Sequence, residues 1–113
     1  MSKQTPAKKK RAVRGSRTGR PIMALLDLLG RRWTLRILWE LREGPLTSRA
    51  LRTACDEASP TVMQTRLSEL REAGLIELLP GDGYGPTGLG RDLNETFLPL
   101  HRFAERWSKQ TTD

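Results

Sequence analysis

Two short helical segments with only a few residues between them, at residues 47–73, restrict the possible folds of this chain most strongly. In the first segment, Leu51 and Cys55 lie four residues apart, which is the spacing of one buried helical face. The second begins at Ser59-Pro60, because serine is a favoured N-cap and proline fits the first helical position. Such a pair is typical of a helix-turn-helix, although an antiparallel pair in a helical bundle has the same pattern.

The second of these helices is expected to span Ser59–Ala73, with Gly74 as its C-terminal stop. Met63, Leu67 and Leu70 share one face of it and are expected to point inward. The opposite face carries short, neutral side chains that form hydrogen bonds, whereas a purely solvated helix usually carries Lys and Glu. In a helix-turn-helix this helix enters the major groove. The candidates for reading base edges there are Thr61, Gln64, Thr65 and Ser68.

The residues after this helix predict a small wing. Leu75–Leu79 has the composition of a short strand, and a turn-rich stretch follows at Pro80–Pro86. A helical bundle needs neither feature, so the pattern favours a winged helix-turn-helix. Asp82–Tyr84 are expected to form the wing tip, which is short and acidic and would contact DNA only weakly. The predicted fold class is therefore α+β and mostly helical.

A helix over Trp33–Glu43 is expected to precede this segment. Trp33, Ile37 and Leu41 recur at steps of four residues, which predicts a single buried face. Gly44-Pro45 ends the helix, because proline cannot continue it.

The two ends of the chain are expected to form dimerisation helices. Ile22–Leu29 is a short segment that is apolar nearly all round, and the longest helix follows Thr87, with a kink expected at Pro99. A domain this small could not cover both apolar surfaces by itself. The residues expected at the dimer interface are Ile22, Leu25, Leu26, Leu93, Phe97, Leu100, Phe103, Ala104 and Trp107.

The net charge of +7 is concentrated at the N-terminus. Residues 1–20 carry eight basic and no acidic side chains, and the remaining residues sum to −1. We expect residues 1–20 to be a disordered basic arm and residues 21–113 to be the folded domain. A basic arm beside a locally basic middle segment suggests a polyanionic partner, although a solvated tail has the same composition. The candidates for phosphate contacts are Arg49, Arg52 and Arg71, together with Lys8, Lys9, Lys10, Arg11, Arg17 and Arg20 of the arm.

The residue inventory argues against an enzyme. His101 is the only histidine and lies far in sequence from Cys55, the only cysteine, and no cluster of residues has metal-ligand spacing. We therefore predict no catalytic residue, no metal and no cofactor. Cys55 is interpreted as a small core residue rather than a sensor. A single cysteine and the lack of a long apolar run suggest a soluble cytoplasmic protein.

A glycine pattern in the turn-rich stretch resembles a nucleotide-binding motif. Gly83, Gly85 and Gly88 have the spacing G-x-G-x-x-G after a predicted strand and before a helix. A dinucleotide-binding unit also needs a second parallel strand, for which the chain has no residues left. We interpret the pattern as a coincidence within the wing.

From Arg20 to Trp107 the chain resembles the HxlR-type winged-helix regulators of bacteria. The segments that carry the resemblance are PIMALLDL at Pro21–Leu28, LGRRWTLRILWEL at Leu29–Leu41, ALRTA at Ala50–Ala54, SPTVMQTRLSELREAGLIE at Ser59–Glu77 and PTGLGRDL at Pro86–Leu93. The resemblance implies a dimer joined through its first and last helices, which presents two recognition helices to a near-palindromic operator. The sequence departs from the family pattern at Arg20, where many members have a cysteine that some use for sensing. The wing is also shorter than is usual for the family.

The sequence thus predicts a regulator of transcription that binds duplex DNA specifically as a homodimer; no pattern in it identifies an effector. A non-specific architectural protein that binds nucleic acid through the basic arm is the main alternative. A protein-interaction module with an idle DNA face is a third possibility.

Overall fold

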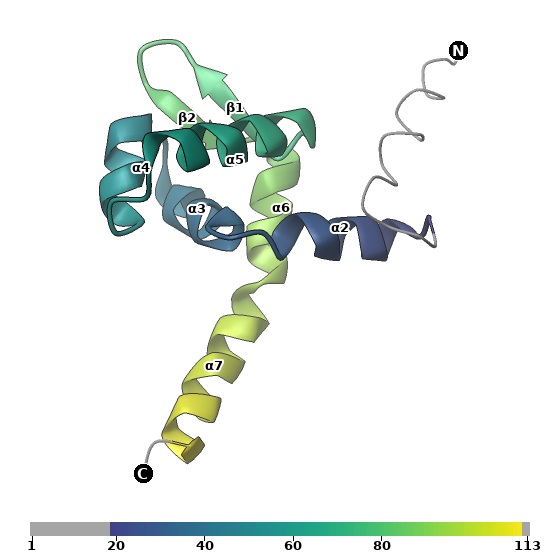
Figure 1. Ribbon diagram of the computed structural model, residues 1–113. Coiled ribbons are helices and arrows are strands. Elements are labelled where there is room, and N and C mark those ends of the chain that lie inside the picture. Colours follow the sequence, from purple (N-terminus) through teal and green to yellow (C-terminus); the bar gives the residue numbers. More distant parts are fainter. Residues whose placement is uncertain (1–18, 112–113) are drawn as a thin grey trace. The chain divides into compact units, whose positions relative to one another are not determined.

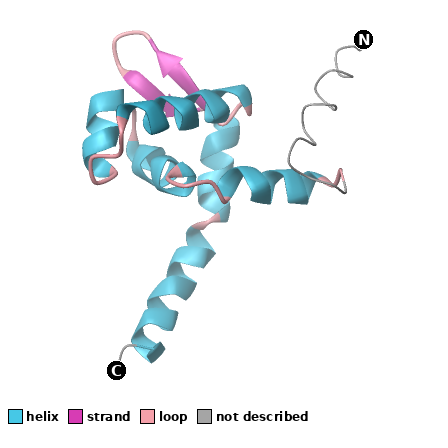
Figure 2. Cartoon of the chain, viewed as in Figure 1, coloured by secondary structure: helices cyan, strands magenta, loops and turns pink. Residues whose placement is uncertain are grey.

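The computed structural model describes residues 19–111, which are mostly helical with a small two-stranded sheet (Figures 1 and 2). This composition confirms the predicted fold class. The chain divides into two compact units, the first ending at Leu35 and the second beginning at Arg36. The elements in chain order are α2 (Pro21–Leu29), α3 (Thr34–Glu40), the 3-10 helix η1 (Leu41–Glu43), α4 (Ser48–Ala54), α5 (Pro60–Glu72), β1 (Ile76–Leu79), β2 (Gly83–Pro86), α6 (Gly88–Thr96) and α7 (Leu98–Thr111).

The first unit contains the short apolar helix α2 that the sequence predicts. Pro21 occupies its first turn, and the backbone N–H of Gly30 donates to the carbonyl of Leu26 over 2.9 Å to close its end. An ion pair of 2.7 Å between Asp27 and Arg31 follows directly along the surface. Although α2 is apolar, it is not fully buried: Leu26, for example, is 53% exposed.

The prediction that Trp33 lies in the next helix is wrong. Its φ angle is 75°, in the left-handed region, so the right-handed helix begins one residue later at Thr34. The Arg32 guanidinium lies 4.9 Å from the centre of the indole ring. The spacing of Trp33 to Ile37 and Leu41 is that of one helical face. In the structure, however, Trp33 belongs to the turn after α2, where the chain changes direction.

The core of the second unit lies between α3, α4, α5 and the wing. Ile37, Leu38 and Leu41 contribute side chains with no exposed area, as predicted for Ile37 and Leu41. The helix-turn-helix contributes Leu51 of α4, Cys55 at its C-cap, and Met63, Leu67 and Leu70 of α5, all of them fully buried. Both predicted inner faces are confirmed. At about 25 cal/mol per Å² of apolar surface, this burial is the main favourable term in folding the domain.

The joint between α4 and α5 has an unusual backbone. Asp56 and Glu57 have φ angles of 57° and 61°, two consecutive left-handed residues without a glycine. This conformation lets the chain turn in three residues, at a steric cost that the packing of the two helices must offset. The tight connection predicted from the sequence is therefore present and strained.

The wing is an antiparallel pair in which Ile76 faces Pro86 and Leu78 faces Tyr84. The turn-rich stretch at residues 80–86 is turn only in its first half, and its second half forms β2. The backbone of Tyr84 in β2 also exchanges two hydrogen bonds with Leu46, of 2.8 and 2.9 Å, on the side away from β1. Gly83, with a φ of 94°, lies so close to the Leu46 carbonyl that any Cβ would clash there.

The predicted long C-terminal helix is divided into α6 and α7. Phe97 is the C-cap of α6, and Pro99 lies in the first turn of α7, where its missing N–H is tolerated. The kink expected at Pro99 is thus a break. The amide of Asn94 donates to the Leu38 carbonyl over 3.0 Å and so fastens α6 to α3.

The first turn of α7 is attached to α3 by an aromatic contact. The His101 ring lies 3.6 Å from the ring of Trp39, centre to centre, and the Arg42 guanidinium lies 3.5 Å from the same indole. Beyond this turn α7 has no buried residue, and it projects away from α6 (Figure 1).

Candidate nucleic-acid interface

Helix α5 presents the polar face that the sequence predicts for base reading. Thr61, Gln64, Thr65 and Ser68 are all exposed. The hydroxyl of Thr65 donates to the carbonyl of Thr61 over 3.0 Å, so its lone pairs remain available to a donor outside the chain. Short neutral side chains that hold both donors and acceptors suit the edges of base pairs better than they suit a merely solvated surface.

Several hydrogen bonds fix the direction of α5. The side chain of Ser59 accepts from the backbone N–H of Val62 over 3.1 Å, which confirms it as the N-cap. Arg52 donates from Nε to the carbonyl of Ala58 over 3.0 Å, and Arg36 donates to the carbonyl of Ala54 over 2.7 Å. The joint that aims α5 is therefore held on both sides by guanidinium groups.

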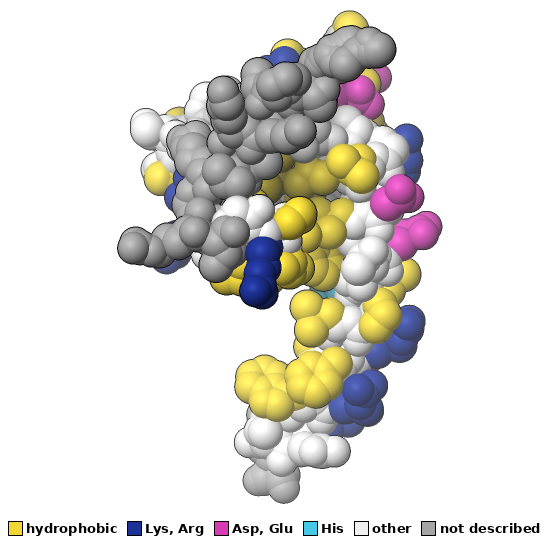
Figure 3. Space-filling view, turned by 90° about the vertical axis from the view of Figure 1, so that its right-hand side faces the viewer, with side chains coloured by type: hydrophobic (Ala, Val, Ile, Leu, Met, Phe, Trp, Pro, Cys, Tyr) yellow, Lys and Arg dark blue, Asp and Glu magenta, His cyan; other side chains and the backbone are white. Residues whose placement is uncertain are grey.

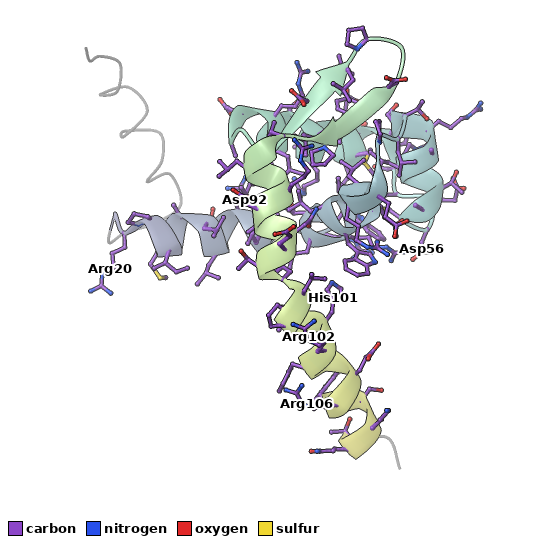
Figure 4. All side chains as sticks on the ribbon, turned by 180° about the vertical axis from the view of Figure 1, so that it is seen from behind. Arg20, Asp56, Asp92, His101, Arg102 and Arg106 are labelled. Carbon is purple, nitrogen blue, oxygen red and sulfur yellow. The ribbon has the colours of Figure 1, made fainter. Side chains whose placement is uncertain are left out.

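Arg52 has a structural role that the sequence did not indicate. It was proposed only as a phosphate contact, yet its Nε–H is bound inside the helix-turn-helix. Arg49 and Arg71, the other two phosphate candidates of the folded domain, are exposed. Arg66 pairs with Glu69 at 3.3 Å. The positive charge near α5 is accompanied by acidic side chains, among them Asp56 in the joint (Figure 4).

Tyr84 does not lie at the wing tip, as the sequence had suggested. The turn consists of residues 80–82, so of the predicted tip only Asp82 belongs to it. Tyr84 lies in β2 and is 9% exposed, and its phenol oxygen is 3.5 Å from Nε2 of Gln64. One signal in the sequence was available: a single aromatic residue between two glycines is typical of a strand that packs closely against backbone.

The predicted basic arm lies almost wholly outside the described residues. Lys8, Lys9, Lys10, Arg11 and Arg17 belong to residues 1–18, about which the structure gives no description. Arg20, the last residue of the arm, is exposed and directly precedes α2 in the first unit (Figure 4). The assignment of these residues to DNA stays a prediction.

The residues predicted for the dimer interface differ in exposure. In α7, Leu100 and Trp107 are 54% and 59% exposed, and in the space-filling view apolar side chains line one flank of this helix while Lys and Arg line the other (Figure 3). Leu93 and Phe97 are half-buried at the end of α6. In the first unit Ile22 and Leu26 are exposed and Leu25 is half-buried. The interface itself stays a prediction.

Cys55 lies in a closed environment. It is fully buried between α4 and its neighbours, and burial raises the pKa of its thiol, against a weaker opposing effect of Arg36. A thiol whose pKa is raised is a poor nucleophile at neutral pH. Within residues 19–111, no group of three or more His, Cys, Asp or Glu side chains could hold a metal ion, and no helix is long and apolar enough to cross a membrane.

Comparison with known proteins identifies the family. Residues 28–112 match the HxlR-like helix-turn-helix family. The chain belongs to this family. A curated relative, an uncharacterized HTH-type transcriptional regulator (sll1512) of Synechocystis, is 28% identical over 96 residues, which cover 80% of this chain and 71% of the relative. HxlR-like proteins are regulators of transcription and not enzymes.

Solved structures share the winged fold. The quinone-bound form of YodB from B. subtilis is 25% identical, with a TM-score of 0.69 over 75% of this chain and 94% of that chain. A possible HxlR family transcriptional factor from Thermoplasma volcanium gives a TM-score of 0.70 at 24% identity, over 80% of this chain and 86% of that chain. Both confirm that the helices and two strands form a winged helix-turn-helix.

Proposed function

We propose that this HxlR-family protein binds duplex DNA sequence-specifically as a homodimer, with α5 in the major groove, and so regulates transcription at the bacterial nucleoid. The observation that carries the proposal is the division of α5 into two faces. Its inner face is fully buried through Met63, Leu67 and Leu70. Its outer face exposes Thr61, Gln64, Thr65 and Ser68, and Glu72 lies on the same face at the C-terminal end of the helix.

Selection of bound fragments from a pool of random duplexes tests this proposal. The wild-type protein should enrich a near-palindromic sequence and prefer it to random duplex by a large factor. Gln64→Ala should cost about 1–3 kcal/mol against the selected duplex and little against random DNA. Glu57→Ala is a matched control, because Glu57 is exposed in the joint and is not assigned to DNA. Equal losses on both duplexes would mean that Gln64 positions the protein rather than reads bases.

The basic arm decides between a specific regulator and an architectural protein. Residues 1–20 carry eight basic side chains, and each phosphate contact steepens the fall of affinity with salt by about 0.9 logarithmic units per decade. Deleting residues 1–19 should weaken binding to all duplexes by a similar factor and flatten this slope, while the preference for the selected duplex survives. An enrichment of no sequence by the full chain would favour the architectural function instead, and no binding would favour a protein-interaction module.

A further inference from the structure

Tyr84 is held in place by backbone hydrogen bonds and by the burial of its ring. Its N–H donates to the carbonyl of Leu46 over 2.8 Å, and its own carbonyl accepts from the N–H of Leu46 over 2.9 Å. On its other side it faces Leu78 across the wing, and its ring is buried. The backbone pairing fixes the Cα of Tyr84, and burial of the ring restricts its rotamer, so the two together limit where the phenol oxygen lies.

The phenol oxygen lies next to the polar face of α5. It is 3.5 Å from Nε2 of Gln64, a long hydrogen bond between residues 20 positions apart in the chain. In the described part of the chain, Tyr84 is the only hydrogen-bond partner of the Gln64 side chain. An exposed glutamine otherwise samples many rotamers and loses that freedom when it binds.

The chemistry of the amide gives this contact a consequence for base reading. A glutamine amide has two N–H donors and one acceptor oxygen. One N–H directed at Tyr84 leaves the other N–H and the oxygen for a second partner. That pair matches adenine, which presents N7 as acceptor and N6 as donor in the major groove, and does not match guanine, which presents two acceptors.

We propose that Tyr84 is a positioning residue that orients the Gln64 amide so that α5 prefers adenine to guanine at one base pair. The inference rests on the proposed function. It adds to that function a link between the wing and the base-reading face that passes through a side chain, without contact between Tyr84 and DNA.

The test uses the full chain and the Tyr84→Phe variant, which keeps the ring and removes only the hydroxyl. Duplexes selected from a random pool first identify the base pair whose preference Gln64→Ala relaxes. Competition binding then measures the ratio of affinities for adenine and guanine there. We expect Tyr84→Phe to lower this ratio by about 3- to 10-fold, the effect of one hydrogen bond, with random-duplex binding unchanged. In the Gln64→Ala background the same substitution should have no effect on the ratio.

Several results would overturn the inference. An unchanged ratio in Tyr84→Phe, while the wild type still selects a sequence through Gln64, would remove the role of Tyr84 and leave the proposed function intact. An equal loss in the Gln64→Ala background would show that the phenol acts through another residue. A wild-type protein that enriches no sequence would overturn the proposed function, and the inference with it.

A measurement without DNA covers the case in which Tyr84→Phe does not fold. NMR relaxation of the side-chain amides in the wild-type protein compares Gln64 with Gln110, an exposed glutamine of α7. The order parameter of the Gln64 amide should be the higher of the two. Equal mobility of the two wild-type amides would contradict the proposal.

Discussion

The helix-turn-helix and the C-terminal helix use their apolar side chains in opposite ways. Leu51 of α4 and Leu67 of α5 have no exposed area, whereas Phe103 and Trp107 of α7 are 50% and 59% exposed and α7 has no buried residue. Both sets follow a helical period in the sequence, so the pattern alone does not distinguish them. The comparison teaches that the helix-turn-helix is covered by its own unit, while α7 has an apolar surface that this unit leaves exposed.

The largest effect on stability should come from a cavity in the buried core of the helix-turn-helix. Leu67→Ala is expected to lower the free energy of unfolding by about 2–5 kcal/mol, because it leaves a cavity among fully buried neighbours. Urea unfolding of both proteins measures the difference. Leu89→Ala is the control: Leu89 is 60% exposed, and its loss should change stability far less. Similar costs for both would show that exposure does not separate the two classes of leucine.

A charge placed on α7 tests whether its exposed apolar surface forms a dimer interface. Leu100→Glu should convert the proposed homodimer to monomer at micromolar concentration, because burial of a leucine contributes about 1.5–3 kcal/mol and a buried carboxylate would oppose association further. Sedimentation measures the mass, and far-ultraviolet circular dichroism checks the fold. Gln110→Glu adds the same charge at another exposed position of α7 and should leave the dimer intact. A wild-type protein that sediments as a monomer would contradict the dimer.

A smaller effect should follow from the strained joint between α4 and α5. Glu57→Gly is expected to raise the free energy of unfolding by about 0.5–1 kcal/mol, because glycine adopts a φ of 61° without the steric cost that a side chain adds. Thermal unfolding measures the change. Glu57→Ala removes the same charge but keeps the Cβ, so it should show no such gain. A gain in both variants would assign the effect to charge instead of backbone.

The smallest effect concerns how the buried Cys55 thiol makes the stability of the domain depend on pH. Burial raises the pKa of the Cys55 thiol, so the folded protein binds this proton more tightly than the unfolded chain does. The contribution of the thiol to stability is complete below the pKa of the unfolded chain and is lost as the pH rises through the raised pKa of the folded protein. Cys55→Ala should lack this alkaline loss when unfolding is followed from pH 7 to pH 10. Rapid alkylation of Cys55 in the native protein would show that the core is open.

Local sequence signals predicted most of the fold. The Ser59-Pro60 start, the stop at Gly74 and the inner faces of α4 and α5 depend on caps and on periodicity, and the structure has all of them. Trp33 and β2 were missed for a different reason. The conformation of Trp33 follows from the turn after α2, and β2 pairs with β1 and, through Tyr84, with the distant residue Leu46. Periodicity does not report such pairing.

The surface residues of the candidate site were predictable from the sequence, but the hydrogen bonds that hold α5 in place were not. Exposure of Thr61 and Gln64 follows from their position opposite Met63, which the helical period determines. The bond from Arg52 to the Ala58 carbonyl depends instead on the folded path of the joint. From composition alone, a basic residue near a recognition helix is expected to contact phosphate. The partner of Arg52 inside the protein is therefore seen only in the structure.

The break between α6 and α7 has a mechanical consequence for the spacing of two DNA-reading heads. A helix of the length of α7 spans about 20 Å at 1.5 Å per residue, and His101 attaches only its first turn to Trp39. In a dimer joined along α7, a rotation of about 10° at the break displaces the far end of this lever by about 3.5 Å, close to the rise of one base pair. In such a dimer, small changes at Phe97 and Pro99 would thus be converted into whole steps along the duplex. The angle at this joint, rather than the shape of α5, would decide how many base pairs separate the two half-sites.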